Sequence, residues 1–384
     1  MAASRSRLLA VCISAAVSTV LLITGCQGVS NSAAPQAAVA SAFVYVVSNP
    51  SGNNLAINAF SAGSTGQLTP VPGSPFATNI RAIAANRNFL FGTDGTNIYS
   101  FSIAANGALT QVSSINGLQS IVGAGVDTLF LDRTGTTLYA HLINDSNDDY
   151  EFFSADHSTG VLTYLGATDS GLGVSPLSFT GNDGYAYSTS CFHGDTSLFF
   201  FKRNNDGTLT LPPFGPFIDS PDPTHLCPEA VAADSTSNLV IAFGPLGGPG
   251  IETTPPQADG VVLAVYSVDS SGFLTSSSTV ANMPQTDFAS ALMISPSGKF
   301  LASGRFSLEV FHFNGANPIT PFTGLLTHDQ IDQIAWDNHD NLYAISLSAN
   351  KLSVFTVTAT NAAPAPGSPY AITNPMGIAI ARRE

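Results

Sequence analysis

The side chains best suited to chemistry in this sequence lie just before, or at the start of, short runs of small and apolar residues. Arg81, His225 and Glu229 are the candidate catalytic residues, because an arginine and a histidine that face a carboxylate could polarise a carbonyl group and activate water. Candidate ligand-binding residues occupy the corresponding places of other runs: Gln119, Asp287, His328, Asp329 and Asn374. The alternative is that Arg81 pairs with a nearby carboxylate while the others face solvent or cap turns.

Stronger catalytic and cofactor motifs do not occur in the sequence. It has no Gly-x-Ser-x-Gly elbow, no His-Glu-x-x-His, no phosphate loop and no dinucleotide fingerprint, so we expect no cofactor. Residues 145–151 carry oxygen-bearing side chains at alternate positions, as calcium loops do, but Tyr150 replaces the glycine of the sharp turn. We therefore predict a solvated loop and no metal site. Arg305 follows a β-rich run and is expected to form a structural ion pair.

The elements that would position these residues are strands. From residue 42 onward β-rich runs alternate with turn clusters, and no stretch keeps a helical apolar period for three turns. The phrase Gly-x-Leu-Thr recurs at residues 66–69, 107–110, 160–163, 207–210 and 272–275, with a degenerate copy at 317–320. A repeat of roughly 40 to 65 residues with about four strands per unit predicts the blades of a propeller.

Counting these units predicts an all-β fold, a seven-bladed β-propeller of four-stranded antiparallel blades. The blades are expected at residues 42–78, 79–117, 118–174, 175–223, 224–285, 286–328 and 329–372. The first blade begins with the pattern of a second strand, whereas residues 375–381 repeat the pattern of an inner strand. We therefore expect the C-terminal strand to complete the first blade and close the ring, which removes exposed sheet edges. The candidate residues would then converge at one mouth of the central channel.

These motifs resemble those of the seven-bladed propellers related to 6-phosphogluconolactonase, which are common as exported bacterial proteins. The resemblance covers residues 42–382. It rests on Gly-x-Leu-Thr, on Pro-Gly-Ser-Pro-Phe at residues 72–76, and on Ser-Pro-Ser-Gly-Lys at residues 295–299, which is similar to the family's turn between first and second strands. It implies lactone hydrolysis as one activity. The family's Pro-His-x-His segment is absent, and the comparable positions are residues 224–230 and 285–289, so enzyme activity stays open.

The N-terminal sequence has the pattern of an export signal. Arg5 and Arg7 precede an uncharged run over residues 8–23, which is short for a membrane-spanning helix. The run ends in Ile-Thr-Gly-Cys, which resembles the lipobox of bacterial lipoproteins and predicts lipidation of Cys26. We expect a signal peptide over residues 1–25, a flexible tether over 26–41 and the propeller over 42–384. The chain would be anchored in the cell envelope, on the periplasmic or outer-surface side. The alternative is an ordinary signal peptide that is cut elsewhere.

The cysteines fit an oxidising compartment. Cys12 and Cys26 lie within or just after the signal, which leaves Cys191 and Cys227 as a predicted disulfide. Two buried free thiols are the alternative. Neither cysteine lies in a metal-binding spacing.

The charge of the chain narrows the choice of partners. It has 12 Lys and Arg against 26 Asp and Glu, a net charge of -14, and only 10% charged residues. Nucleic acid and acidic membrane surfaces are excluded as partners of the folded part, because no basic segment could release counterions. The chain would contact the membrane only through its lipid anchor. We predict a monomeric binding module for a glycan, a protein or a small molecule at the channel mouth, with hydrolysis of a sugar lactone as the alternative.

Overall fold

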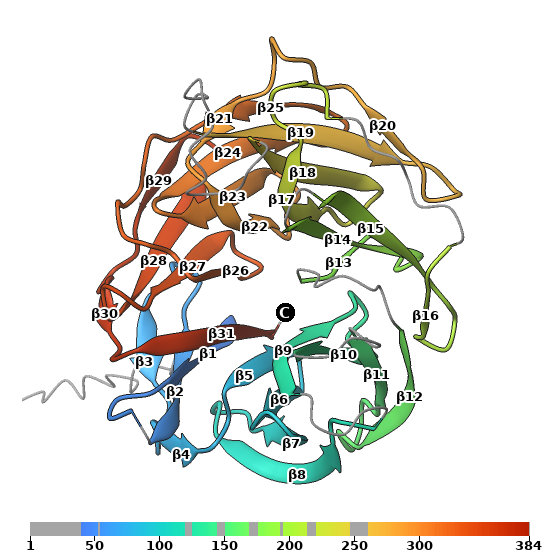
Figure 1. Cartoon of the computed structure of the whole chain (residues 1–384). Coiled ribbons are helices and arrows are strands. Elements are labelled where there is room, and N and C mark those ends of the chain that lie inside the picture. The colour runs from blue at the N-terminus through green and yellow to red at the C-terminus, as the bar shows by residue number, and fades with distance from the viewer. Residues whose placement is uncertain are drawn as a thin grey trace, which may run out of the picture. The chain divides into compact units, whose positions relative to one another are not determined.

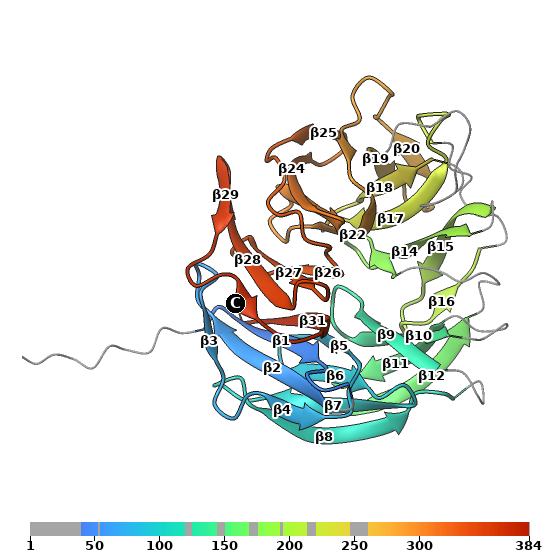
Figure 2. The same ribbon diagram turned by 60° about the vertical axis from the view of Figure 1, so that its left-hand side comes forward.

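The computed structural model describes residues 40–52, 54–119, 125–143, 150–168, 176–192, 195–212, 220–245 and 260–383, without the side chains of 143, 191–192 and 195–197. Within these ranges the secondary structure is entirely β, arranged as seven antiparallel sheets around a central axis (Figures 1 and 2). The predicted seven-bladed β-propeller is therefore confirmed. Among the described residues there is also no helix long and apolar enough to cross a membrane.

Each blade runs from an inner strand at the axis to an outer strand. Blade 1 contains β31 (Pro375–Arg382), β1 (Ala42–Ser48), β2 (Leu55–Ala62), β3 (Leu68–Pro70) and the added β4 (Phe76–Thr78). Blade 2 contains β5 (Ala82–Ala85), β6 (Phe89–Thr93), β7 (Asn97–Ile103) and β8 (Leu109–Asn116). Blade 3 contains β9 (Gly125–Leu131), β10 (Thr137–Ile143), β11 (Tyr150–Ala155) and β12 (Leu162–Thr168). Blade 4 contains β13 (Ser178–Phe179), β14 (Tyr185–Phe192), β15 (Asp195–Arg203) and β16 (Leu209–Thr210).

The remaining three blades follow the same plan. Blade 5 contains β17 (Cys227–Ala233), β18 (Asn238–Gly244), β19 (Val261–Val268), β20 (Leu274–Ser276) and the added β21 (Gln285–Thr286). Blade 6 contains β22 (Ala289–Ile294), β23 (Phe300–Arg305), β24 (Leu308–Asn314) and β25 (Asn317–Pro321). Blade 7 contains β26 (Gln333–Trp336), β27 (Asn341–Ser346), β28 (Lys351–Thr358), β29 (Asn361–Pro364) and the added β30 (Tyr370–Ala371).

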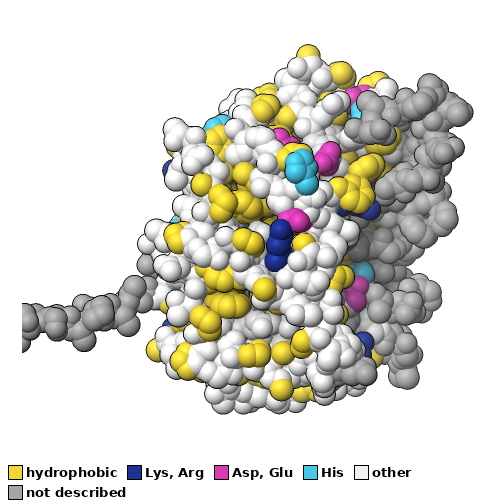
Figure 3. Space-filling model, turned by 90° about the vertical axis from the view of Figure 1, so that its left-hand side faces the viewer, with side chains coloured by type: hydrophobic (Ala, Val, Ile, Leu, Met, Phe, Trp, Pro, Cys, Tyr) yellow, Lys and Arg dark blue, Asp and Glu magenta, His cyan; other side chains and the backbone are white. Residues whose placement is uncertain are grey.

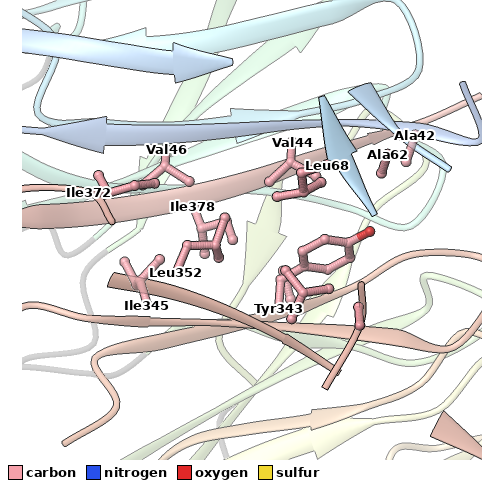
Figure 4. Packing of buried hydrophobic residues seen from close by; sticks show 13 residues of the cluster. Ala42, Val44, Val46, Ala62, Leu68, Tyr343, Ile345, Leu352, Ile372 and Ile378 are labelled. Atoms are coloured by element: carbon pink, nitrogen blue, oxygen red, sulfur yellow. The ribbon is translucent and has the colours of Figure 1, made fainter. Parts of the chain in front are cut away.

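The ring closes as the sequence predicts. β31 pairs antiparallel with β1, with Val44 opposite Ile380 and Val46 opposite Ile378. The two strands pack against blade 7, where Val44, Val46 and Ile378 meet Tyr343 and other buried side chains (Figure 4). Because β31 pairs with β1, the first strand of the chain has no unpaired edge, and the two ends of the propeller are held in one sheet.

The hydrophobic core is divided among the seven junctions between neighbouring blades. Each of seven clusters of buried apolar residues draws its members from two adjacent blades. The face of the molecule drawn in Figure 3 carries few charged side chains, and apolar ones are scattered over it. This arrangement means that each blade is stabilised mainly by its neighbours.

The recurrent Gly-x-Leu-Thr phrase has a structural cause. Its glycine lies in the turn before the outermost strand with a positive φ, for example 86° at Gly107, and a Cβ there would lie 2.6 Å from the ring of Phe43 in the preceding blade. A tyrosine on the second strand of the preceding blade donates a hydrogen bond to the glycine carbonyl at three junctions: Tyr45 to Gly107 at 2.9 Å, Tyr139 to Gly207 at 2.7 Å and Tyr187 to Gly272 at 2.7 Å. The repeat is therefore explained by contacts between blades. Only glycine both adopts the positive φ and leaves room for the side chain of the preceding blade.

Candidate functional site

The inner strands of all seven blades line one central cavity of about 810 Å³. Its charged lining residues are few: Arg87, Asp132, Arg133, Glu229, Asp332 and Arg382. We call the end where the inner strands begin, marked by Glu229 and Asp332, the upper mouth. The end where they finish, marked by Arg87, Arg133 and Arg382, is the lower mouth. The channel therefore has an acidic end and a basic end.

Glu229 is the sequence-predicted catalytic residue that lines the cavity. A β-bulge between Pro228 and Ala230 leaves Glu229 without an opposite residue on β18, and bulges of this kind re-aim side chains next to functional sites. Both carboxylate oxygens are buried, and neither makes a well-formed hydrogen bond within the described residues, although the backbone amide of Ala289 is close enough to act on the carboxylate. A Cβ on Gly244 would lie 2.4 Å from Oε1 of Glu229, so glycine at that position makes room for the carboxylate.

The environment of Glu229 changes its acidity. Burial raises the pKa of Glu229 from 4.5 to about 7, and the charge of Arg305 and the amide of Ala289 offset part of this rise. A carboxyl group with a pKa near neutrality can exchange a proton with a ligand or with water at physiological pH. Glu229 therefore has the properties of a general acid or base, and it has unused hydrogen-bonding capacity.

Arg305 lies beside Glu229 in an aromatic setting. Its guanidinium carbon is 5.6 Å from the ring centre of Phe288 and 5.2 Å from that of Phe306, and the two rings form an edge-to-face pair. The expected structural ion pair is wrong, since Arg305 takes part in none of the ion pairs found in the described part of the chain. Phe306 is 48% exposed, so an apolar ring beside a cation faces solvent at the upper mouth.

Two further carboxyl groups lie in blade 6 close to this cation. The exposed Asp287 accepts a hydrogen bond of 2.7 Å from the hydroxyl of Ser307. Burial, and secondarily the charge of Asp287, raise the pKa of Glu309 to about 6, while a hydrogen bond from Thr286 lowers it. The acid-rich surroundings of Arg305 are suited to a ligand that presents hydroxyl groups.

His225 and Arg81 do not join Glu229 at the cavity. His225 is buried, with Nδ1 at 3.0 Å from Asp222 Oδ2 and at 2.9 Å from Thr224 Oγ1, and it is absent from the cavity lining. Arg81 is exposed and also absent from the lining, although its backbone amide donates to Thr93. Of the three candidate catalytic residues, only Glu229 faces the channel.

The predicted ligand-binding residues have separate environments. Gln119 donates its backbone amide to the buried carboxylate of Glu151 at 2.8 Å. Asp329 forms an ion pair of 2.7 Å with Lys351 and accepts a hydrogen bond from Thr327, while His328 next to it is exposed.

Asn374 stabilises the turn into β31. It has a positive φ of 49°, and its side chain donates to the carbonyl of Asn49 at 3.0 Å. None of these predicted binding residues lines the central cavity.

The cysteines and the acidic loop are only partly described. Cys227 is buried and disulfide-bonded, while the side chain of Cys191, its predicted partner, lies outside the described residues. Cys26 and residues 144–149 also lie outside them. Among the residues that are described, no group of three His, Cys, Asp or Glu side chains could hold a metal ion.

Three arginines near the channel were not predicted to be functional: the sequence indicated a structural ion pair for Arg305 and singled out neither Arg133 nor Arg382. They lie at the ends of strands or in the turns between them, whereas the predicted site residues lie in the segments that lead into the inner strands. A usable signal was present: cations are rare in this chain, with 12 Lys and Arg among 384 residues, so each one deserved a functional interpretation.

Comparisons with known proteins identify the fold. No protein-family model matches the sequence, and no curated protein matches it. Among solved structures, the "putative 6-phosphogluconolactonase" of Bacteroides fragilis matches with a TM-score of 0.65 at 14% identity, over 90% of this chain and 99% of that one. The periplasmic gluconolactonase of Pseudomonas aeruginosa matches with a TM-score of 0.59 at 12% identity, over 88% and 98% of the two chains. The predicted resemblance is thus confirmed for the propeller fold.

Proposed function

We propose that this chain is a propeller of the cell envelope that binds a small polar ligand at the upper mouth of its channel. The observation that carries the proposal is the carboxylate of Glu229, which is buried at the cavity with only the amide of Ala289 close to it and no well-formed hydrogen bond among the described residues. Buried polar groups nearly always have good partners, and one that lacks them beside a cavity is suited to a ligand that supplies donors.

The size and lining of the cavity favour a small molecule over a protein. Sites for small molecules typically have volumes of about 300 to 1,000 Å³, and the cavity of about 810 Å³ falls in that range. Hydroxyl groups of a ligand would donate to Glu229 in the cavity. Outside the cavity lining, Asp287 would accept a further hydroxyl group, and the exposed ring of Phe306 would contact an apolar face of the ligand. A sugar or sugar acid combines these two features, so we assign the ligand to that class.

Hydrolysis of a sugar lactone is the second candidate, and the acidity of Glu229 favours it. The carboxylate would take a proton from water while hydroxide adds to the lactone carbonyl carbon, and Arg305 would stabilise the oxyanion. Collapse of the intermediate would break the bond to the ring oxygen, which takes the proton back from Glu229 to give the open hydroxy acid. Two of the similar structures are named as lactonases, which agrees with this candidate.

The location follows from the N-terminal sequence. We propose that residues 1–25 direct export and that lipidation of Cys26 anchors the propeller. The periplasmic location in the name of the Pseudomonas aeruginosa structure supports an envelope location. Replacing Cys26 with serine should move the full chain from the membrane pellet to the soluble fraction. A wild-type chain that is already soluble would contradict the anchor.

Binding and catalysis are separated by two measurements on the same variants. Titration calorimetry with glucose, a neutral sugar, tests binding at the upper mouth, and acid release from glucono-lactone tests hydrolysis. Glu229→Gln should weaken binding by roughly tenfold, because it removes one charge-assisted hydrogen bond. Asp206→Asn is the matched control, since it changes an exposed carboxylate in the outer hairpin of blade 4. Binding without acid release supports the binding module. Acid release that is lost in Glu229→Gln supports the lactonase. A chain that shows neither binding nor acid release refutes both candidates.

A further inference from the structure

The lower mouth of the channel concentrates positive charge in an acidic protein. Of the 12 Lys and Arg in the chain, Arg5 and Arg7 precede the propeller, and three of the remaining ten, Arg87, Arg133 and Arg382, line the cavity at this mouth. They come from blades 2, 3 and 1. The C-terminal end of β31, which carries Arg382, lies beside the ring axis (Figure 1).

Neutral acceptors hold two of these arginines in place. Arg133 reaches from blade 3 to blades 4 and 5, donating Nε to the carbonyl of Phe179 at 2.7 Å and Nη2 to that of Ala233 at 2.6 Å. Arg382 donates Nε and Nη2 to the carbonyl of Trp336 at 3.2 and 3.0 Å. Carbonyl groups fix the orientation of a guanidinium without neutralising it. In both residues Nη1 has no hydrogen-bond partner among the described residues, so donors remain available to a ligand.

The carboxylates around this mouth already have partners. Asp132 lines the cavity, but its fully buried side chain forms an ion pair of 2.6 Å with Arg203. Asp183 accepts the backbone amides of Arg133 and Thr134 at 3.0 and 3.1 Å, and it is not part of the lining.

Two other nearby carboxylates accept hydrogen bonds from neutral side chains. Asp337 accepts the hydroxyl of Tyr343 at 2.8 Å, and Asp234 accepts the side-chain amide of Asn238 at 2.8 Å. Neither lines the cavity. The charged side chains that line the channel at this end are therefore three arginines and the paired Asp132, whereas Asp183 and Asp234 lie outside the lining and stabilise the charge of Arg133.

Arg382 is also influenced by the charge of Arg133. Burial lowers the pKa of Arg382, and the positive charge of Arg133 lowers it further, while Asp337 raises it. Both arginines nevertheless are exposed to solvent, and both line the channel. An anion between two guanidinium groups would relieve the repulsion and gain charge-assisted hydrogen bonds, often two from one planar group.

We propose that the lower mouth is a binding site for a small oxyanion, carrying a phosphate or a carboxylate group, held by Arg133 and Arg382 with Arg87 adding charge. This site is distinct from the upper mouth. Glu229 and the residue whose carbonyl binds Arg133, Ala233, are four residues apart on β17, which corresponds to about 13 Å along a strand. The net charge of -14 does not prevent binding, because exposed charges farther than about 10 Å away are screened at moderate salt.

The test uses the full chain in a buffer of about 0.1 M sodium chloride, where distant charges are screened, without phosphate or carboxylate ions. Inorganic phosphate and acetate are titrated in separate calorimetry experiments, which distinguish the two anion types, and thermal unfolding is followed in parallel. Binding of either anion with a rise in melting temperature is expected. Arg133→Gln and Arg382→Gln should each weaken it roughly tenfold. Arg87→Gln should weaken it less, about two- to fivefold.

Controls keep the proposal falsifiable. Lys299→Gln removes an exposed cation from the turn between β22 and β23, on the same side of the molecule but outside the cavity lining, and should leave anion binding unchanged. Should Arg133→Gln or Arg382→Gln fail to fold, the lysine variants preserve the charge, and Arg87→Gln disturbs no side-chain contact found in the described residues. Failure of both anions to bind the wild-type chain overturns the proposal, as does equal weakening by Lys299→Gln.

Discussion

Replacing Glu229 with glutamine is expected to stabilise the protein at alkaline pH and to leave its stability unchanged at acidic pH. In the folded chain the pKa of Glu229 is about 7, compared with 4.5 for the ordinary group. The folded state therefore binds this proton more tightly than the unfolded state does. The resulting stabilisation is fully present below pH 4.5 and is lost as the pH rises to about 7.

The magnitude follows from the same two pKa values. At about 1.4 kcal/mol for each tenfold change in an ionisation constant, the rise from 4.5 to about 7 corresponds to a penalty of about 3 kcal/mol above neutrality. This is an upper bound, because the chain can relax around the charge. Glutamine has nearly the same shape as the protonated carboxyl and carries no charge at any pH, so the variant escapes the penalty.

Denaturant unfolding of both chains between pH 4 and pH 8.5 measures the difference in unfolding free energy, and other titrating groups cancel in the comparison. Glu309→Gln serves as the matched variant. The pKa of Glu309 is raised only to about 6, so the gain in unfolding free energy of this variant over the wild type should be smaller and should reach its full value at a lower pH. A difference between Glu229→Gln and wild type that does not vary with pH would refute the reasoning. So would a wild type that gains stability relative to the variant as the pH rises.

Three other substitutions test the contacts between blades and the disulfide. Gly107→Ala should destabilise the fold by more than about 2 kcal/mol, because the positive φ and the ring of Phe43 both exclude a Cβ, whereas Gly324→Ala, with open space around it, should be near neutral in the same unfolding assay. Tyr187→Phe should lose about 1 kcal/mol with its buried hydrogen bond to Gly272, and a value near zero would show that the contact contributes nothing. Cys227→Ser should lose about 2 to 4 kcal/mol, and adding a reductant should lower the melting temperature of the wild type but not of the variant.

Much of the fold was predictable because it is repeated. Seven copies of one local pattern predict seven sheets, and the surplus inner-strand pattern at the C-terminus predicts that β31 completes blade 1. The small residues of the inner strands, such as Ala82 and Ala84 in β5, fit the narrow space around the axis. The glycines of the Gly-x-Leu-Thr phrase identify the turns that meet the preceding blade.

The site was less predictable, because the direction of a side chain depends on β-bulges, which have no clear signal in the sequence. Glu229 faces the cavity through the bulge that follows Pro228, and Ser290 occupies the equivalent bulge in blade 6. His225 lies only four residues before Glu229, yet its ring turns to Asp222 instead. Spacing along the chain did not distinguish a side chain that faces the cavity from one that binds a neighbouring carboxylate.

Taken alone, the sequence determined the strand type, the number of blades and the closure of the ring, since each depends on local patterns that every blade repeats. Only the tertiary structure decided which charges face the channel. Arg133, Glu229 and Arg382 come from different blades and are brought to one cavity by closure of the ring. A charge acts through its distance to other charges and through its exposure to water, and both are properties of the assembled ring.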